Sequence, residues 1–351
     1  MSRRTRAALT LIVVCATGLA ALAAPAPATV PPATADAGDV ATYRTMVTRL
    51  RAGEPYYTAI GEELRRGNYA TREVFNWRTP LFMSGLSLVP DAVSYSALVV
   101  LGLVLCGATL ASTNTEAIAV RWTAIIMQVG VLILLMNRRS VVMSEAWTGV
   151  LIGLSVCAYG LRRPRFALPL GLLALFVREL AAPYCVVCTL AAASNRRWRE
   201  VGAWLIGGCL YAGYYGWHLT QVLAHRLPAD PSDPSSWFQM GGLASLMATA
   251  HWNGWLVLTP RPATALALAL VIGGILYARA PMHLRLASAI YVAFFLVAGK
   301  VFDGYWGLIA WPTWALACGY GVEAVAQSVS ALFQRSLSLP VGSSASFPPR
   351  P

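Results

Sequence analysis

The residues best suited to chemistry in this chain are carboxylates and arginines that interrupt long apolar stretches. Ionisable side chains are costly at membrane depth, so those found there usually pair, bind or react. A carboxylate can accept the proton of a hydroxyl group, and arginine binds phosphate oxygens through two parallel hydrogen bonds. We expect the candidates on one side of the membrane, where they would form a site for an anionic, phosphate-bearing ligand: Asp36, Asp39, Glu54, Arg72, Glu73, Arg78, Arg138, Arg139, Glu145, Arg178, Glu179, Lys300 and Asp303.

The elements that must position these residues are apolar helices. Of 351 residues, 57% are hydrophobic and 12% are charged, whereas soluble domains have about 25% charged residues. Such a chain would expose large apolar patches in water, but it suits a lipid bilayer. A helical span needs roughly 20 apolar residues, and stretches of this kind recur from end to end. We therefore predict an all-α polytopic membrane protein with about ten transmembrane helices.

The predicted organisation is one transmembrane domain over residues 1–335, followed by a disordered tail at 336–351 that is rich in Ser and Pro. The first span covers 7–24, and Ala-x-Ala sequences after it leave a cleaved signal peptide as an alternative. Residues 241–260 are predicted to be interfacial, with a further crossing there as the alternative. The remaining spans, within 92–327, are predicted at 92–112, 118–136, 145–161, 166–178, 183–194, 202–223, 262–279, 285–300 and 305–327.

Arginine clusters set the predicted orientation. The net charge is +12, and clusters lie at 3–6, 162–165, 196–199 and 279–285, before or between the apolar runs. Positive residues are retained in the cytoplasm, so the N-terminus is expected inside and the active face periplasmic or extracellular. The Arg-rich, Lys-poor composition favours a bacterial source and thus the bacterial cytoplasmic (inner) membrane. Clusters of this kind are topology signals, so we expect no nucleic-acid partner.

The most polar part of the chain is the predicted outside loop at 25–91. Apolar residues with helical spacing at 46–50 predict a short helix, and a second is predicted at 58–66. Gly53-Glu54-Pro55 separates them as a helix breaker. We expect both helices to lie at the outer membrane surface, with 80–90 as a short interfacial piece.

Several short motifs follow one another in a distinctive order. They are Asp39 near the start of the loop, Tyr43, a Gly-x-x-Tyr-like turn at 53–57, an aromatic-rich Pro-Leu entry at 75–81, Glu145 at the start of a span, Arg178-Glu179 in a short span, and Tyr305-Trp306-Gly307-Leu308 followed by Pro312. In this order the sequence resembles bacterial membrane glycosyltransferases of the GT-C superfamily. The resemblance extends over most of the chain.

This resemblance implies a transferase that moves a hexosyl or pentosyl unit from a polyprenyl-phosphate-linked sugar to a glycan or lipid acceptor. It also implies membrane lipid as a partner and no cofactor. Asp39 matches the acidic position that acts as general base on the acceptor hydroxyl. The residues implied in binding the substrate and its phosphate are Arg78, Arg178, Glu179, Glu145 and Tyr43. No Asp-x-Asp or Glu-x-Asp pair is present, so no metal is expected.

The same residues also have structural interpretations. Asp39 could cap a helix that begins near Val40, and Glu145 could complement a helix dipole. Arg178 and Glu179 could form an internal ion pair. Two other functions stay open: a transporter or flippase of a lipid-linked or anionic solute, and a non-enzymatic membrane assembly factor. The internal symmetry typical of many transporters is not visible in the sequence.

Overall fold

In a computed structural model, the chain is described over residues 2–25, 38–233, 239–299 and 301–333. These residues form helices joined by turns and loops, with no strand among them. The α-helices are α1 (Arg3–Ala23), α2 (Asp39–Arg51), α3 (Tyr56–Arg66), α4 (Pro80–Ser87), α5 (Asp91–Ser112), α6 (Ile118–Leu135), α7 (Ser144–Gly160), α8 (Pro164–Val177), α9 (Ala182–Ser194), α10 (Trp198–His225), α11 (Gly242–Ala250), α12 (Arg261–Leu276), α13 (Met282–Val297) and α14 (Gly307–Phe333).

The two short helices predicted in the polar loop are confirmed as α2 and α3. Gly53, between them, has a φ of 89°, a conformation that glycine adopts without steric cost and that ends the first helix. Residues 241–260 form only the nine-residue α11 and a 3-10 turn at Leu256–Leu258, so the further crossing considered there is not formed. Two of the candidate ionisable residues, Asp36 and Lys300, and the predicted tail at 336–351 lie outside the described residues.

The prediction of about ten membrane spans is not confirmed. Within the described part of the chain, four helices are long and apolar enough to cross a membrane: Arg4–Ala23, Asp91–Ser112, Ile118–Leu135 and Asp303–Phe333. The other predicted spans are helical, but most are short. Helices α8 and α9 have 14 and 13 residues, which at about 1.5 Å per residue reach roughly 20 Å of a hydrocarbon core about 30 Å thick. Helix α10 has 28 residues but is too rich in tyrosine, tryptophan and glycine to be equally apolar.

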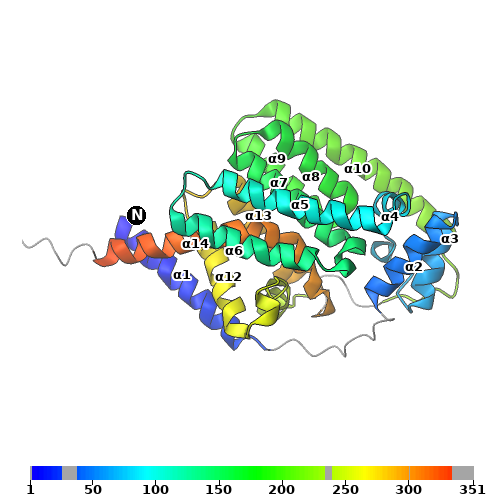
Figure 1. The fold of residues 1–351 in the computed structure, drawn as a ribbon, viewed down its shortest axis with the longest axis horizontal. Helices are drawn as coiled ribbons and strands as arrows, with labels where there is room; N and C mark the ends of the chain where they lie inside the picture. Colours follow the sequence, from blue (N-terminus) through cyan, green and yellow to red (C-terminus); the bar gives the residue numbers. More distant parts are fainter. Residues whose placement is uncertain (1, 26–37, 234–238, 300, 334–351) are drawn as a thin grey trace, which may run out of the picture.

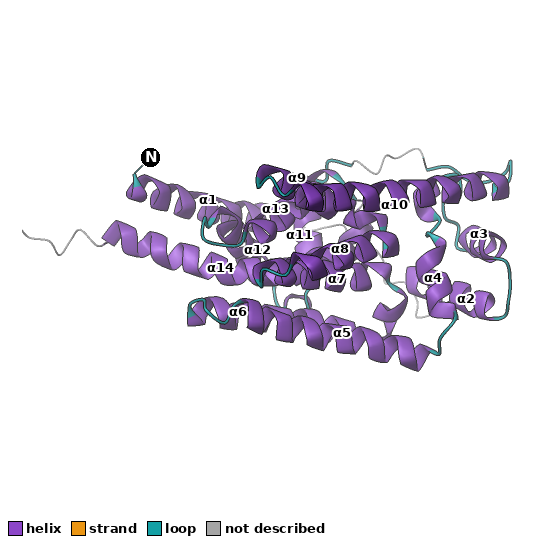
Figure 2. Ribbon diagram, turned by 90° about the horizontal axis from the view of Figure 1, so that it is seen from above, coloured by secondary structure: helices purple, strands orange, loops and turns teal. Residues whose placement is uncertain are grey.

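The helices form an elongated bundle with two distinct ends (Figures 1 and 2). At one end lie α2, α3 and α4, beside the start of α5 and the end of α10. At the other end lie the start of α1 and the end of α14. The Tyr159 ring, near the end of α7, stacks on His283 with centroids 3.6 Å apart, and Arg197 Nη2 lies 3.3 Å from His283 Nε2. The three arginine-bearing loops at 162–165, 196–199 and 279–285 therefore meet at one end of α7.

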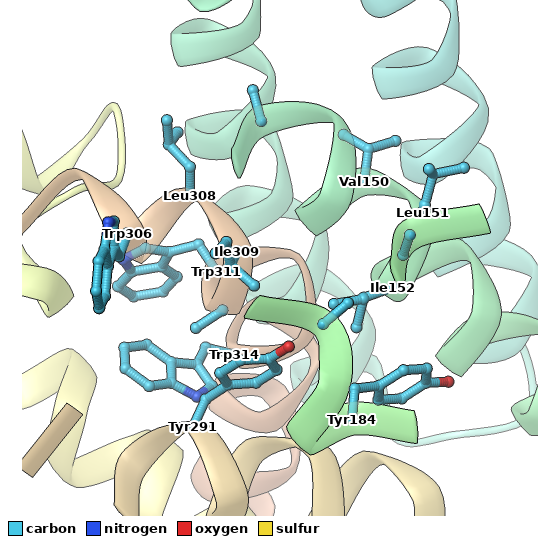
Figure 3. Packing of buried hydrophobic residues seen from close by; sticks show 14 of the residues in the cluster. Val150, Leu151, Ile152, Tyr184, Tyr291, Trp306, Leu308, Ile309, Trp311 and Trp314 are labelled. Atoms are coloured by element: carbon cyan, nitrogen blue, oxygen red, sulfur yellow. The ribbon is translucent and has the colours of Figure 1, made fainter. Parts of the chain in front are cut away.

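Helix α14 runs through the centre of the bundle and packs against α1, α6, α7 and α12. Its first half is entirely buried, and Trp311 and Trp314 lie among side chains of neighbouring helices (Figure 3). Small residues allow the close approach on which helices in membranes depend. A Cβ atom at Gly321 would collide with the backbone carbonyl of Leu270 on α12, and one at Gly274 with that of Ala317. The 3-10 turn at Val301–Trp306, directly before α14, contributes residues to the site below.

Candidate functional site

Asp39 is the first residue of α2, and both of its carboxylate oxygens accept hydrogen bonds from tyrosines. The hydroxyl of Tyr69 donates to Oδ1 at 2.5 Å, and that of Tyr305 donates to Oδ2 at 3.1 Å. Burial and the neighbouring carboxylate raise the pKa of Tyr69, so this phenol stays protonated and remains a donor. No side chain caps the start of α2, so Asp39 does not serve as the cap that its position suggested.

Arg78 contacts Tyr43, which lies one helical turn along α2 from Asp39. Its Nη2 donates to the Tyr43 hydroxyl at 2.5 Å, and its guanidinium lies 5.1 Å from the Tyr43 ring centroid. The backbone of Arg78 is held by the Tyr56 hydroxyl, which donates to its carbonyl oxygen at 2.7 Å. Burial raises the pKa of Tyr43, so its phenol is neutral and can accept from the arginine. This arginine is 7% exposed and belongs to the interior of the molecule, not to its surface.

A chain of alternating charges continues from Arg78 into the bundle. Glu145, in the first turn of α7, has an Oε1 atom 3.6 Å from Arg78 and 3.2 Å from Arg178. Arg178, which ends α8, lies 3.0 Å from Glu179. Glu145 is fully buried and Arg178 is 4% exposed. Buried charges are tolerated only when paired, and these two arginines and two glutamates balance one another. The ion pair considered for Arg178 and Glu179 is therefore present, as part of a larger network.

These groups border a cavity of about 220 Å³. Its three aspartates outnumber its two arginines, so net charge alone would not attract an anion. A phosphate would instead depend on directed donors. Nε of Arg78 and Nε of Arg178 are buried and have no hydrogen-bond acceptor within the described residues. The cavity is lined by Asp39, Tyr43, Asn68, Tyr69, Ala70, Asn76, Arg78, Arg178, Asp233, Asp303, Tyr305 and Trp306.

The structure brings together the six residues predicted for the site: Asp39, Tyr43, Arg78 and Arg178 line the cavity, and Glu145 and Glu179 pair with its arginines. Their catalytic and binding roles stay predictions. Of the other ionisable residues expected on that side, Asp303 also lines the cavity, whereas Glu54 and Arg72 do not. Glu54 pairs with Arg49 at 2.5 Å, and Arg72 donates to the Pro228 carbonyl at 2.9 Å.

Sequence reasoning missed Tyr69, which makes the shorter hydrogen bond to Asp39. It follows α3 through a turn in which Asn68 has a φ of 59°. The local sequence does not show that Tyr69 contacts Asp39, because the two residues are 30 positions apart. The turn chemistry of Gly67-Asn68 was the available signal, since both residue types favour the left-handed conformation.

Within the described ranges, no group of three or more His, Cys, Asp or Glu side chains is placed to hold a metal ion. No protein-family model matches the chain, and neither the curated proteins nor the solved structures give a significant match. The likeness to GT-C glycosyltransferases therefore depends on the residues of this chain alone.

Proposed function

We propose that this protein is a membrane glycosyltransferase that moves a sugar from a polyprenyl-phosphate donor to an acceptor hydroxyl at the outer face of a bacterial cytoplasmic membrane. One observation carries the proposal: the Asp39 carboxylate, held on both oxygens by tyrosine hydroxyls, shares a cavity with two buried arginines. A fixed carboxylate beside donors that can bind phosphate suits glycosyl transfer from a lipid phosphate, because the base and the charge-stabilising groups are positioned in advance.

Asp39 acts as the general base in this proposal. The acceptor oxygen attacks the anomeric carbon of the donor while its proton passes to Asp39. The bond between that carbon and the phosphate oxygen breaks, and its electron pair leaves with the lipid phosphate. Two hydroxyl donors orient the carboxylate, so little reorganisation precedes proton transfer.

Arg78 and Arg178 bind the departing phosphate. Each has a buried Nε donor without an acceptor in the described part of the chain, and both arginines pair with Glu145. The phosphate gains charge as the glycosidic bond breaks, so donors fixed in advance stabilise the transition state more than the ground state. Because the glutamates already balance the arginines, we expect this binding to depend on hydrogen-bond geometry more than on net charge.

A transfer assay tests the proposal. The purified full-length protein in lipid is supplied with polyprenyl-phosphate hexoses and pentoses and a cell-envelope extract as acceptor, and release of free polyprenyl phosphate is measured. Replacing Asp39 by Asn keeps its size but removes the base, so we expect release to fall by at least about 100-fold. Glu62→Gln is the matched control, because Glu62 is an exposed carboxylate on α3 that pairs with Arg49 outside the cavity.

The outcomes separate the enzyme class from the residue assignment. Release that requires Asp39 supports both. Release that survives Asp39→Asn keeps the enzyme class and removes Asp39 as the base. No release from any donor by a folded protein overturns the proposal in favour of a transporter or a membrane assembly factor, and movement of intact donor across reconstituted vesicles then distinguishes these two.

A further inference from the structure

A second cavity, of about 370 Å³, lies along a different face of α2 from the Asp39 site. Arg44, Val47, Thr48 and Arg51 of α2 form one wall, on a face of the helix roughly 110° around its axis from Asp39 and Tyr43, which line the first cavity. We call it the arginine groove. Its other walls come from Asp91, Tyr95, Arg138, Val141 and Val142.

The arginine groove carries more positive charge than its own carboxylate neutralises. Arg51 is already paired with Asp91 at 2.9 Å and donates to the Val89 carbonyl at the same distance. The exposed guanidinium of Arg44 has no hydrogen bond or ion pair within the described residues. That of Arg138 lies 5.3 Å from the centroid of the Tyr95 ring, and its N–H groups make no hydrogen bond or ion pair with any other described residue. Two guanidinium groups are therefore available to an anion.

The groove lies where two of the candidate membrane helices end. Asp91 is the first residue of α5, and Arg138 follows the end of α6 by three residues. Both helices carry exposed apolar side chains, such as Val100 on α5 and Ile126 on α6, suited to contact with lipid chains. If these helices span the bilayer, the groove lies at the level of the lipid headgroups. Tyr95 is the aromatic type enriched at that level.

We propose that the arginine groove binds the anionic phosphate headgroup of a membrane lipid, with Arg44 and Arg138 as the phosphate-binding residues. One guanidinium group can donate two parallel hydrogen bonds to phosphate oxygens. Val47, Val141 and Val142 provide an apolar surface for the part of the lipid next to the headgroup. This site is distinct from the Asp39 cavity and does not depend on the proposed transferase activity.

Lipid binding to the purified full-length chain in detergent tests the proposal. Native mass spectrometry measures bound phosphatidylglycerol and phosphatidylcholine over a range of concentrations. We expect phosphatidylglycerol to bind more tightly, and we expect Arg44→Gln and Arg138→Gln to weaken its binding about fivefold each and roughly 25-fold together. Arg139→Gln is the matched control, since Arg139 is the exposed neighbour of Arg138 but does not line the groove.

Further measurements distinguish a lipid phosphate from a soluble one and check that the variants fold. Inorganic phosphate at equal concentration should not displace the lipid; displacement, or binding of phosphate without lipid, would assign the groove to a soluble anion and overturn the lipid assignment. Equal affinity for both lipids, or equal losses in Arg44→Gln and Arg139→Gln, would overturn the site. Circular dichroism of the variants, and the charge-conserving Arg44→Lys with Arg138→Lys, which should retain part of the binding, show that the loss is not unfolding.

Discussion

The hydroxyl of Tyr305 donates to Asp39 Oδ2 at 3.1 Å, although the two residues are 266 positions apart in the chain. The bond joins the turn before α14 to the first residue of α2. Tyr69 completes the arrangement at 2.5 Å from Oδ1. The orientation of the proposed base therefore depends on where the turn before α14 lies relative to the start of α2.

Removing either tyrosine hydroxyl should slow transfer without unfolding the protein. In Tyr305→Phe and in Tyr69→Phe, the carboxylate loses one donor and samples other orientations, so we expect kcat to fall about tenfold with little change in KM. Tyr277→Phe, at the opposite end of the bundle, is the control. Release of polyprenyl phosphate over a range of donor concentrations measures both constants. A change in KM alone would show that these tyrosines bind donor and do not position Asp39.

The buried charges around Glu145 should be strongly coupled. Arg178→Met leaves the network with an excess negative charge in the interior, and we expect it to destabilise the protein by about 3 kcal/mol. Adding Glu145→Gln removes that excess, so the double variant should be more stable than the sum of the single effects. Thermal unfolding of the wild type, the two single variants and the double variant in one detergent measures this coupling in a double-mutant cycle. Strict additivity would mean that the two side chains do not interact.

Close packing of α14 predicts a position-specific effect of one methyl group. In Gly321→Ala, the new Cβ meets the Leu270 carbonyl, and we expect a loss of about 1–3 kcal/mol from overpacking. In Gly208→Ala, on α10, no atom lies within 4 Å of the new Cβ, and the helix should gain up to about 1 kcal/mol. Melting temperatures of the two variants test this contrast. Equal shifts would mean that α14 and α12 do not approach this closely.

The loop after α10 should lose its attachment to α3 in acid. Arg65 binds both oxygens of Asp230 at 2.7 and 3.0 Å and, as the largest cause, lowers the pKa of Asp230 from 3.8 to about 2. Since the folded-state pKa is the lower one, the stabilisation is complete above pH 3.8 and disappears as the pH falls towards 2.

Asp230→Asn should therefore lower the free energy of unfolding by about 1–2 kcal/mol at pH 6 and have almost no effect near pH 2. Melting temperatures of both proteins across this range measure the difference. The control Asp91→Asn removes an exposed carboxylate whose partner Arg51 is 39% exposed, and we expect less than about 0.5 kcal/mol from it. A difference for Asp230→Asn that does not change with pH would mean that ionisation of Asp230 plays no part.

The sequence predicted the elements well where local rules decide them. Helical spacing and the Gly53-Glu54-Pro55 breaker located α2 and α3, and apolar runs located the longer helices. It also marked Glu145 and Arg178, because an ionisable residue in apolar surroundings is costly enough to be visible without a structure. Asp39 and Arg78, which lie in the polar loop, were instead marked by the resemblance to GT-C glycosyltransferases. Arg138 was not among the residues predicted for that site, and the structure places it in the wall of the arginine groove.

The number of candidate spans was wrong for a physical reason. An apolar residue has the same hydropathy whether lipid or another helix surrounds it. Most of α7 is buried inside the protein, whereas α5 exposes much of its surface. Local sequence thus determined that this chain is helical and apolar, and approximately where most of its helices lie. Only the tertiary structure decided which helices face outward and brought Tyr69 and Tyr305 to Asp39, because contacts between residues 30 and 266 positions apart leave no mark on local spacing.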